Sequence, residues 1–358
     1  MITSIRIATD PSTFADELAP LADLVDGPSS TCSWIVAWCR ATSAQTALVL
    51  GSDSGGNVVF ALPLERTTVK KVHALRTIAF RQGPFGAVLS TQPVAELFDD
   101  RVRSLLRSAL WQAGFRVPLV FLFDIRGAAE CGASSAIALQ SKHVASASVP
   151  ASDAAGATFV GKKESTELRR RHRRLADRVG DAVETHFPAA VDDVRAALTR
   201  LLASKRQLSE GRPTASELDH PDLDRFFQNL AVECSERGDL EVLIATLGSE
   251  SVVVAENLVV CARGEAHGLV QTFDADFSKF SPGRLVLRDL VDELARRNIT
   301  TVNFGKTESK LPRFATESEQ IYDYVLPIHK LLDRPTAAFA RKAMARDAIE
   351  PQAEAFSA

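Results

Sequence analysis

The chain has 358 residues, of which 46% are hydrophobic and 24% are charged. These fractions exclude a disordered or fibrous chain, and the length is enough for about two or three domains. The 42 basic and 45 acidic residues give a net charge of −3, which argues against a general nucleic-acid binder, since such proteins carry a clear basic excess.

The N-terminal half shows strand and helix patterns in turn. Apolar runs on both sides of a polar, glycine-rich turn at 52–56 predict a β-hairpin. The predicted elements are the strands Thr46–Gly51, Asn57–Leu64 and Leu75–Phe80, the helix Pro93–Ala113 and the strand Val117–Asp124. Gly114 follows the helix as a typical end signal. The small residues of 132–136 and 146–156 predict a surface connection, with the domain boundary near residue 150.

The C-terminal half repeats this mixture. Its predicted helices are Lys162–Val179, Val191–Lys205, Leu218–Glu236 and Gly283–Arg297, with Ala337–Arg346 in the tail. Its predicted strands are Leu240–Leu247, Ser251–Ala262, His267–Phe273, Thr300–Phe304 and Ile321–Leu326. Consecutive hairpins followed by a helix and a strand differ from the even rhythm of a doubly wound fold.

Both halves contain a hairpin, a further strand, a long helix and a strand. We therefore predict a mixed α/β (α+β) fold built as a tandem pair of similar lobes. Each lobe is expected to be a mostly antiparallel mixed sheet flanked by helices. The expected parts are an N-terminal lobe at 1–150, a C-terminal lobe at 151–334, and a helix and tail at 335–358.

One segment, Gln271–Leu287, carries more information than the others. A strand ends, an Asp-rich loop follows, and Ser-Pro-Gly-Arg then opens an amphipathic helix. Ser281 suits the N-cap and Pro282 the first helical position, while Gly283 lets another group approach the backbone closely. Free N–H groups at a helix start beside Arg284 form a candidate cradle for a pyrophosphate. The alternative is an ordinary capped helix start.

Four motifs along the chain belong to this argument. They are an aromatic motif at Ser33–Trp38, a basic helix at Lys162–Leu175, the helix-opening motif Phe280–Leu285 and a Gly and Glu-x-Lys motif at Asn303–Lys310. Together they resemble the CelD-like acetyltransferases, a branch of the GNAT superfamily allied to the FemAB peptidyltransferases. The resemblance implies two GNAT lobes, of which the second binds acetyl-CoA or another acyl-CoA as co-substrate through Ser281, Gly283, Arg284 and Leu285.

Acyl transfer from a thioester to an amine needs a group that takes the proton of the amine and a donor for the oxyanion. Asp274 and Asp276 follow the strand expected to line the cleft, and Glu308 and Lys310 follow the next strand. We expect Asp274 or Glu308 to act as the base and Lys310 to bind an anionic acceptor or steady negative charge. The alternative is that these residues are solvated loop groups or turn-formers. His267 is a further candidate base, although a lone histidine is more often structural.

Residues 161–180 have eight basic and three acidic side chains, or 8 − 3 = +5. The apolar residues Leu168, Leu175 and Val179 form one narrow seam, so most of the helix Lys162–Arg178 should be exposed. Such a face attracts an anionic partner, although a solvated charged helix has the same pattern. No aromatic residues lie among the arginines, so we expect no sequence-specific DNA binding and favour an anionic acceptor or a membrane surface.

The five cysteines are odd in number and widely spaced, without a CxxC. This pattern argues against disulfides or a zinc site and favours a reducing compartment. No signal-peptide pattern starts the sequence, and no run of about 18 apolar residues predicts a membrane span. We expect a cytoplasmic protein without a metal, either free or peripheral at the inner membrane surface.

Three functions remain open at this point. The first is acyl-CoA-dependent N-acyl transfer to a small-molecule amine, such as an amino sugar, an amino acid or a cell-envelope or polysaccharide precursor. The second is FemAB-type aminoacyl transfer from aminoacyl-tRNA, which predicts binding of tRNA with a steep salt dependence. The third is a non-catalytic GNAT-fold accessory protein of polysaccharide biosynthesis, which Ser309 favours because it replaces an aromatic residue of the family's motif.

Overall fold

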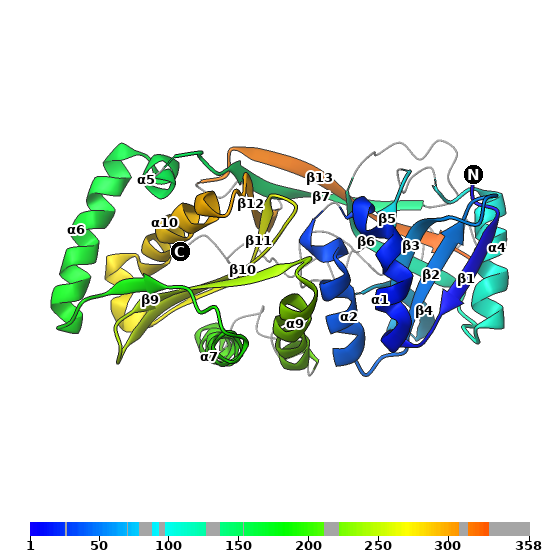
Figure 1. The fold of residues 1–358 in the computed structure, drawn as a ribbon, viewed down its shortest axis with the longest axis horizontal. Coiled ribbons are helices and arrows are strands. Elements are labelled where there is room, and N and C mark those ends of the chain that lie inside the picture. The colour runs from blue at the N-terminus through cyan, green and yellow to red at the C-terminus, as the bar shows by residue number, and fades with distance from the viewer. Residues whose placement is uncertain are drawn as a thin grey trace. The chain divides into compact units, whose positions relative to one another are not determined.

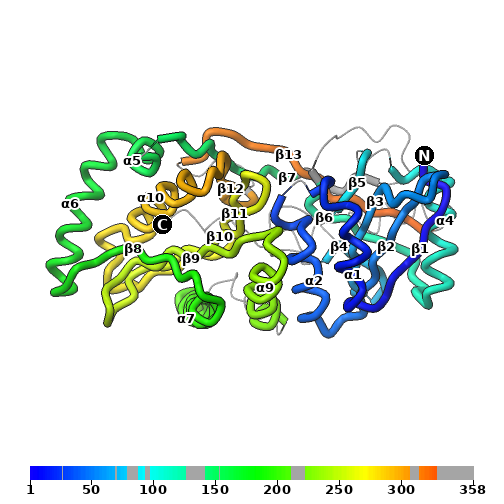
Figure 2. Tube along the Cα trace, in the orientation of Figure 1, coloured from blue at the N-terminus to red at the C-terminus, as the bar shows by residue number. Residues whose placement is uncertain are grey.

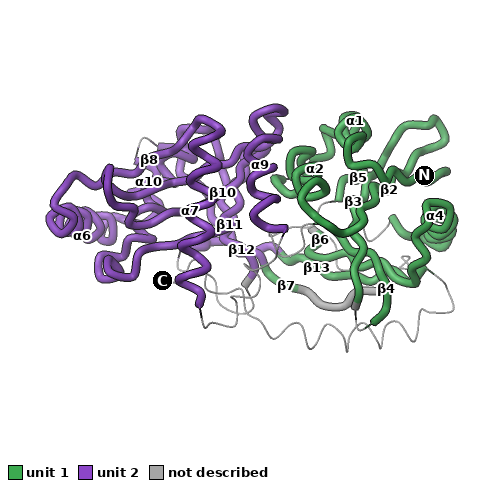
Figure 3. The backbone as a smooth tube through the Cα atoms, turned by 90° about the horizontal axis from the view of Figure 1, so that it is seen from below, with its two compact units in different colours: residues 1–143, 320–350 green, residues 144–319, 351–358 purple. Residues whose placement is uncertain are grey.

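The structure is a computed structural model that describes residues 1–25, 27–69, 71–78, 88–92, 97–126, 137–152, 154–210, 222–307 and 314–328. The predicted helix Ala337–Arg346 and the site candidates Glu308 and Lys310 lie outside the described residues. The described chain forms two units, one of residues 1–143 and 320–328 and the other of residues 144–319 (Figure 3).

The first unit contains a sheet with the strand order β1-β2-β3-β4-β6-β13. All neighbours are antiparallel except β4 and β6, which are parallel. The strands are β1 (Ser4–Ala8), β2 (Thr46–Ser52), β3 (Val58–Val69), β4 (Val72–Thr77), β6 (Leu119–Arg126), β13 (Glu317–Pro327) and the short β5 (Leu89–Ser90) beside β3. The helices are α1 (Phe14–Leu18), α2 (Cys32–Ala41) and α4 (Asp100–Gln112).

The second unit contains a sheet in the order β12-β11-β10-β9-β8, again antiparallel except for one parallel pair, β11 and β12. The strands are β8 (Glu184–His186; Figure 2), β9 (Glu241–Gly248), β10 (Val253–Ala262), β11 (Glu265–Phe273) and β12 (Thr301–Thr307). The helices are α5 (Ala155–Val160), α6 (Lys162–Val179), α7 (Val191–Ser209), α9 (Leu223–Arg237), the 3₁₀-helix η4 (Ala275–Phe280) and α10 (Pro282–Arg296). Strand β7 (Ile137–Ser148) runs from the first unit into the second.

The two units repeat one arrangement of strands. Three successive antiparallel pairings are followed by a parallel pairing, and a helix lies in the crossover between the two parallel strands. That helix is α4 in the first unit and α10 in the second. The predicted fold class, a duplicated mixed α/β lobe with a mostly antiparallel sheet, is therefore confirmed.

In the second unit, helices cover both faces of the sheet (Figure 1). Helices α5, α6 and α10 lie on one face, and α7 and α9 lie on the other. The apolar stripe of α10 packs on alternate residues of β9 and β10, and Leu168 and Leu175 of α6 join the same core. This confirms the predicted narrow apolar seam of α6.

Two predictions about the elements were wrong. Of the single helix expected over Pro93–Ala113, residues 93–96 lie outside the described residues, and Phe98 and Asp99 are not helical. Helix α4 begins at Asp100, where the Asp99 carboxylate accepts a hydrogen bond from the Val102 N–H at 2.7 Å and caps it. The small-residue stretch around residue 146 is no loop, since β7 continues to Ser148. Alanine and serine favour strands weakly, and here the pairing with neighbouring strands outweighs that preference. The sequence also did not predict the strands β1, β5 and β8 or the helices α1, α2 and α5.

Candidate functional site

The start of α10 provides a weaker cradle of amides than its sequence predicts. Ser281 is the N-cap in a left-handed conformation (φ 53°, ψ 54°), and its side chain makes no capping hydrogen bond. The main-chain N–H groups of Arg284 and Leu285 both donate to the Ser281 carbonyl, at 3.0 and 3.3 Å, and the Ser281 N–H donates to Ser278. Pro282 has no N–H to offer. The amide of Gly283 and the positive end of the helix dipole remain to attract an anion.

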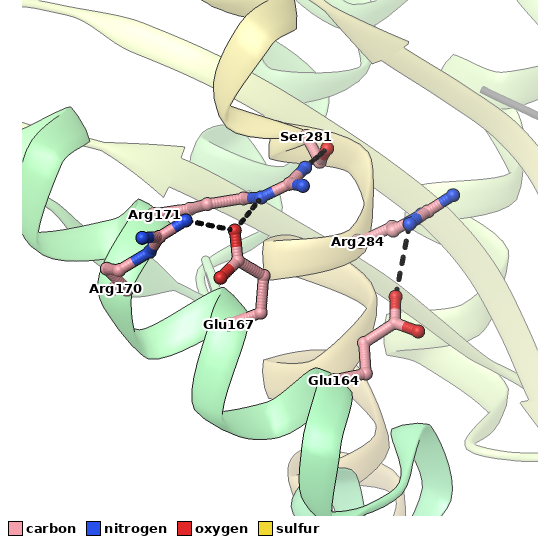
Figure 4. Close-up of polar contacts among 6 residues, drawn as sticks. All are labelled: Glu164, Glu167, Arg170, Arg171, Ser281 and Arg284. Carbon is pink, nitrogen blue, oxygen red and sulfur yellow. Dashed lines mark hydrogen bonds and ion pairs between the residues drawn. The ribbon is translucent and has the colours of Figure 1, made fainter.

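The basic helix α6 meets this helix start (Figure 4). The Nη1 atom of Arg171 donates to the hydroxyl of Ser281, although the two residues are 110 positions apart. The Nε atom of Arg171 donates to Glu167 Oε1 at 3.0 Å, and Arg170 Nη2 reaches the same oxygen at 3.0 Å. The neighbouring Arg284 pairs with Glu164 at 3.1 Å.

We call Arg170, Arg171 and Arg284 the arginine cluster. Their side chains are 61%, 30% and 31% exposed, so each retains contact with solvent. The hydrogen bond from Arg171, and after it the hydrogen bond from Arg170, lowers the pKa of the Glu167 carboxyl below its ordinary value. Each guanidinium has five N–H donors, more than the described contacts occupy, so the cluster can also bind a phosphate.

A buried amide pair lies beneath the same helix start. A Cβ atom built on Gly283 would lie 3.2 Å from the Gln271 side chain, and Gln271 Nε2 donates to the Gly283 carbonyl at 3.2 Å. The absence of a side chain at Gly283 therefore lets Gln271 of β11 approach the helix backbone closely, and a role of Gly283 in binding a carrier stays a prediction. Asn257 lies opposite Gln271 in register on β10, is fully buried, and has no hydrogen-bond partner among the described residues for either amide atom.

Strands β11 and β12 separate next to this region. They pair only from Glu265 with Thr301 to His267 with Asn303, although both strands continue beyond. In the described part of the sheet, residues 268–273 of β11 therefore present an edge that β12 does not cover. Main-chain N–H groups on such an edge are suitable donors to an oxyanion.

The remaining site candidates are scattered. Asp274 is exposed and accepts the Asp276 N–H at 2.9 Å, which is the hydrogen bonding of a turn-forming aspartate. Leu285 is fully buried in the core, so its side chain is not available to a ligand. His267 is buried, and its Nε2 atom lies 3.2 Å from Glu265. Our sequence reasoning did not single out Asn257, although the polar pair Glu256-Asn257 inside an apolar strand is a visible signal.

The described ranges contain no group of three or more His, Cys, Asp or Glu side chains that could hold a metal ion. In the same part of the chain, every helix is too short or too polar to cross a membrane.

Comparison with known proteins supports the assignment of an acyltransferase. Residues 162–313 match the family model of the acetyltransferase (GNAT) domain. No curated protein matches the chain significantly.

Several solved structures are similar over nearly the whole chain. The C-terminal domain (DUF2156) of a putative lysylphosphatidylglycerol synthetase from Agrobacterium fabrum has a TM-score of 0.53 and 14% identity, over 95% of this chain and 97% of the other. A conserved protein of unknown function from Bacteroides thetaiotaomicron has a TM-score of 0.51 and 11% identity, over 91% and 100%. A tandem GNAT protein from the clavulanic acid biosynthesis pathway has a TM-score of 0.48 and 14% identity, over 91% and 99%.

The domain match covers α6 and α10, which are the two elements that form the arginine cluster. The predicted class of enzyme, an acyltransferase, is confirmed by this match. The first two solved structures show that other proteins share the fold.

Proposed function

We propose that the protein is an acyl-CoA-dependent N-acyltransferase and that its second unit binds the diphosphate of the carrier at the start of α10. The observation that carries this proposal is the contact between Arg171 and Ser281. It brings the basic helix to the positive end of another helix, where an anion gains from both the guanidinium groups and the helix dipole. The match of residues 162–313 to an acetyltransferase domain supports the same carrier.

The pantetheine arm of the carrier would follow the open edge of β11. Gln271 belongs to this edge and contacts the helix start, and Asn257 lies opposite it on β10 with an amide that lacks a partner among the described residues. A buried amide without hydrogen bonds is uncommon in proteins. An amide group of the bound arm is the kind of partner that this side chain requires.

The acceptor is an amine. We propose a small molecule such as an amino sugar, an amino acid or a cell-envelope or polysaccharide precursor, in keeping with the resemblance to the CelD-like acetyltransferases. Its neutral nitrogen attacks the thioester carbonyl, and an N–H of the open β11 edge stabilises the oxyanion. Among the candidates from sequence, Asp274, Glu308 and Lys310 stay predictions for the proton transfer and for acceptor binding.

Isothermal titration with acetyl-CoA and with free CoA tests the proposal. We expect saturable binding of both, with similar affinity, because the diphosphate is common to them. Absence of heat with either compound, in protein shown to be folded by circular dichroism, would contradict the carrier site.

A second candidate follows from the outer face of α6. Arginines 169, 170, 173, 174 and 178 are all exposed there. An aminoacyl-tRNA donor would use such a face, and its binding would weaken steeply with salt. Titration with tRNA at two salt concentrations separates the two donors, since only tRNA binding without CoA binding favours the second candidate.

A further inference from the structure

A buried carboxylate on the α7 face of the second sheet has an unused oxygen. Glu256 of β10 is fully buried. Its Oε1 atom accepts from Arg200 Nη2 at 2.6 Å and Nε at 3.1 Å, and from Thr246 Oγ1 at 3.2 Å. Its Oε2 atom is buried and has no hydrogen-bond partner within the described residues. An ionised carboxylate accepts about four hydrogen bonds, so Oε2 can still accept hydrogen bonds from a bound ligand.

A second unused polar atom lies next to it. Thr272 of β11 is directly opposite Glu256 in register, so both side chains project from the same face of the sheet. The Thr272 hydroxyl is buried, and it too has no partner in the described part of the structure. Buried polar groups are nearly always hydrogen-bonded. Two exceptions on neighbouring residues therefore indicate a ligand that binds both.

This row of polar residues ends at the open edge of β11. Thr272 belongs to the stretch that β12 does not cover. The preceding residue, Gln271, projects to the opposite face and contacts Gly283 at the start of α10. Because successive strand residues alternate between faces, the residue after Gln271 on β11 is Thr272, which lies on the other face opposite Glu256. A thioester that passes the edge of β11 reaches the side where Glu256 lies.

The first unit contains a buried glutamate that serves as an internal comparison. Glu65 of β3 is 1% exposed and faces α2. Its Oε2 atom accepts from Trp38 Nε1 at 2.7 Å, and its Oε1 atom accepts from Arg76 Nε at 2.7 Å. Both oxygens of Glu65 are thus hydrogen-bonded, whereas only one oxygen of Glu256 is.

We propose that Glu256 is the catalytic base that receives the proton of the acceptor amine and that the Thr272 hydroxyl orients the amine. This inference rests on the proposed function and assigns to Glu256 the role expected of Asp274 or Glu308. The acceptor is a primary amine that approaches from the α7 face. Arg200 lies between the carboxylate and solvent there, with a side chain that is 42% exposed.

The atoms of the transfer balance with this assignment. The amine nitrogen attacks the thioester carbonyl carbon, and a C–N bond forms. The extra proton of the nitrogen passes to Glu256 Oε2. The C–S bond then breaks with its electron pair on sulfur, and the proton moves from Glu256 to the thiolate, which leaves as the thiol of CoA. The carboxylate is regenerated, and the products are an amide and CoA.

The test compares Glu256→Gln with Glu65→Gln. Three quantities are measured for each variant and for the wild-type protein: CoA affinity by calorimetry, the melting temperature, and thiol release from acetyl-CoA with glucosamine and with free amino acids as amines. We expect Glu256→Gln to retain CoA affinity and to slow thiol release by about 10²- to 10⁴-fold. It should lower the melting temperature by only a few degrees, because the glutamine oxygen can still accept from Arg200 and Thr246. Glu65→Gln should lower the melting temperature more, because its NH2 group cannot accept the hydrogen bond from Trp38 or Arg76 and one buried donor loses its partner.

Thr272→Val provides a second variant, since it removes a hydroxyl without changing the shape of the side chain. It should raise the KM for the amine and leave CoA affinity and the melting temperature unchanged. Normal thiol release by Glu256→Gln would overturn the proposal. A loss of melting temperature as large as that of Glu65→Gln would do the same, and so would a wild-type protein that binds acetyl-CoA but releases no thiol with any of these amines. A wild-type protein that does not bind CoA overturns the carrier site instead.

Discussion

Replacing Arg171 by alanine removes the side chain that joins α6 to the start of α10. In the free protein the guanidinium donates to Ser281 and Glu167. In the complex that we propose, it donates to the diphosphate, and a hydrogen bond to a charged group contributes about 1.5–3 kcal/mol. The side chain is 30% exposed, so solvent screens part of this energy and about 1–2 kcal/mol is a reasonable loss. This corresponds to a rise in the Kd for CoA of about 5- to 30-fold.

The matched control is Arg173→Ala on the same helix. Arg173 is exposed and lies two residues further along, which is about 200° around the helix axis. The substitution removes the same charge at a similar position along α6, but the Arg173 side chain points away from α10. We expect its Kd for CoA to stay within about twofold of wild type, because an exposed charge at that distance is screened by salt. Calorimetric titration at 0.1 M salt measures both variants.

Equal effects of the two replacements would refute the reasoning. If both weaken binding alike, the attraction is a property of the charged helix as a whole and no specific contact exists at the start of α10. If neither does, the diphosphate lies elsewhere. Circular dichroism of Arg171→Ala shows whether the variant is folded. This control is needed because Arg171 also contacts Glu167, so its loss could weaken binding by disturbing α6.

Three further predictions concern stability, thiol chemistry and charge. Gly156→Ala should lower the melting temperature by several degrees, because the added Cβ would lie 2.0 Å from the Arg288 carbonyl where α5 packs on α10, and overpacking of this kind costs about 1–3 kcal/mol. Burial raises the pKa of the Cys39 and Cys261 thiols to about 12, so mass spectrometry should find both unmodified by iodoacetamide at pH 8 until the protein unfolds, since the thiolate is the reactive form. Glu167→Gln should lower the Kd for CoA by about twofold or more in titration, because it removes the carboxylate that two arginines share.

Local patterns were sufficient to predict most of the second unit. The hairpin around Gly248 was predicted as Leu240–Leu247 and Ser251–Ala262, within two residues of β9 and β10, because a turn signal and two apolar runs are adjacent in the sequence. The parallel pairing of β11 with β12 joins strands that a whole helix separates, so no local pattern shows it. Strand β7 was missed for a related reason, since its alanines and serines become a strand only through their neighbours in the sheet.

The site shows the same division between local and distant information. The Ser-Pro-Gly motif predicted the start of α10 within one residue. The contact of Arg171 with Ser281 joins residues 110 positions apart, and the pairing of Asn257 with Gln271 depends on strand register. Sequence spacing predicts neither. The motif indicates where a helix begins, and the packing of α6 supplies the side chain that makes its start suitable for an anion.

The two lobes differ at the helix that crosses between their parallel strands. In the first unit, the Asp99 carboxylate accepts the Val102 N–H at 2.7 Å and so places a negative charge at the start of α4. This charge already interacts with the positive end of the helix dipole, and it repels a second anion. In the second unit, the N-cap is the neutral Ser281, whose hydroxyl is engaged by Arg171. Of the two crossover helices, we therefore expect only α10 to bind an anion, and calorimetry should give one CoA per chain; a stoichiometry of two would mean that the Asp99 cap yields to the ligand.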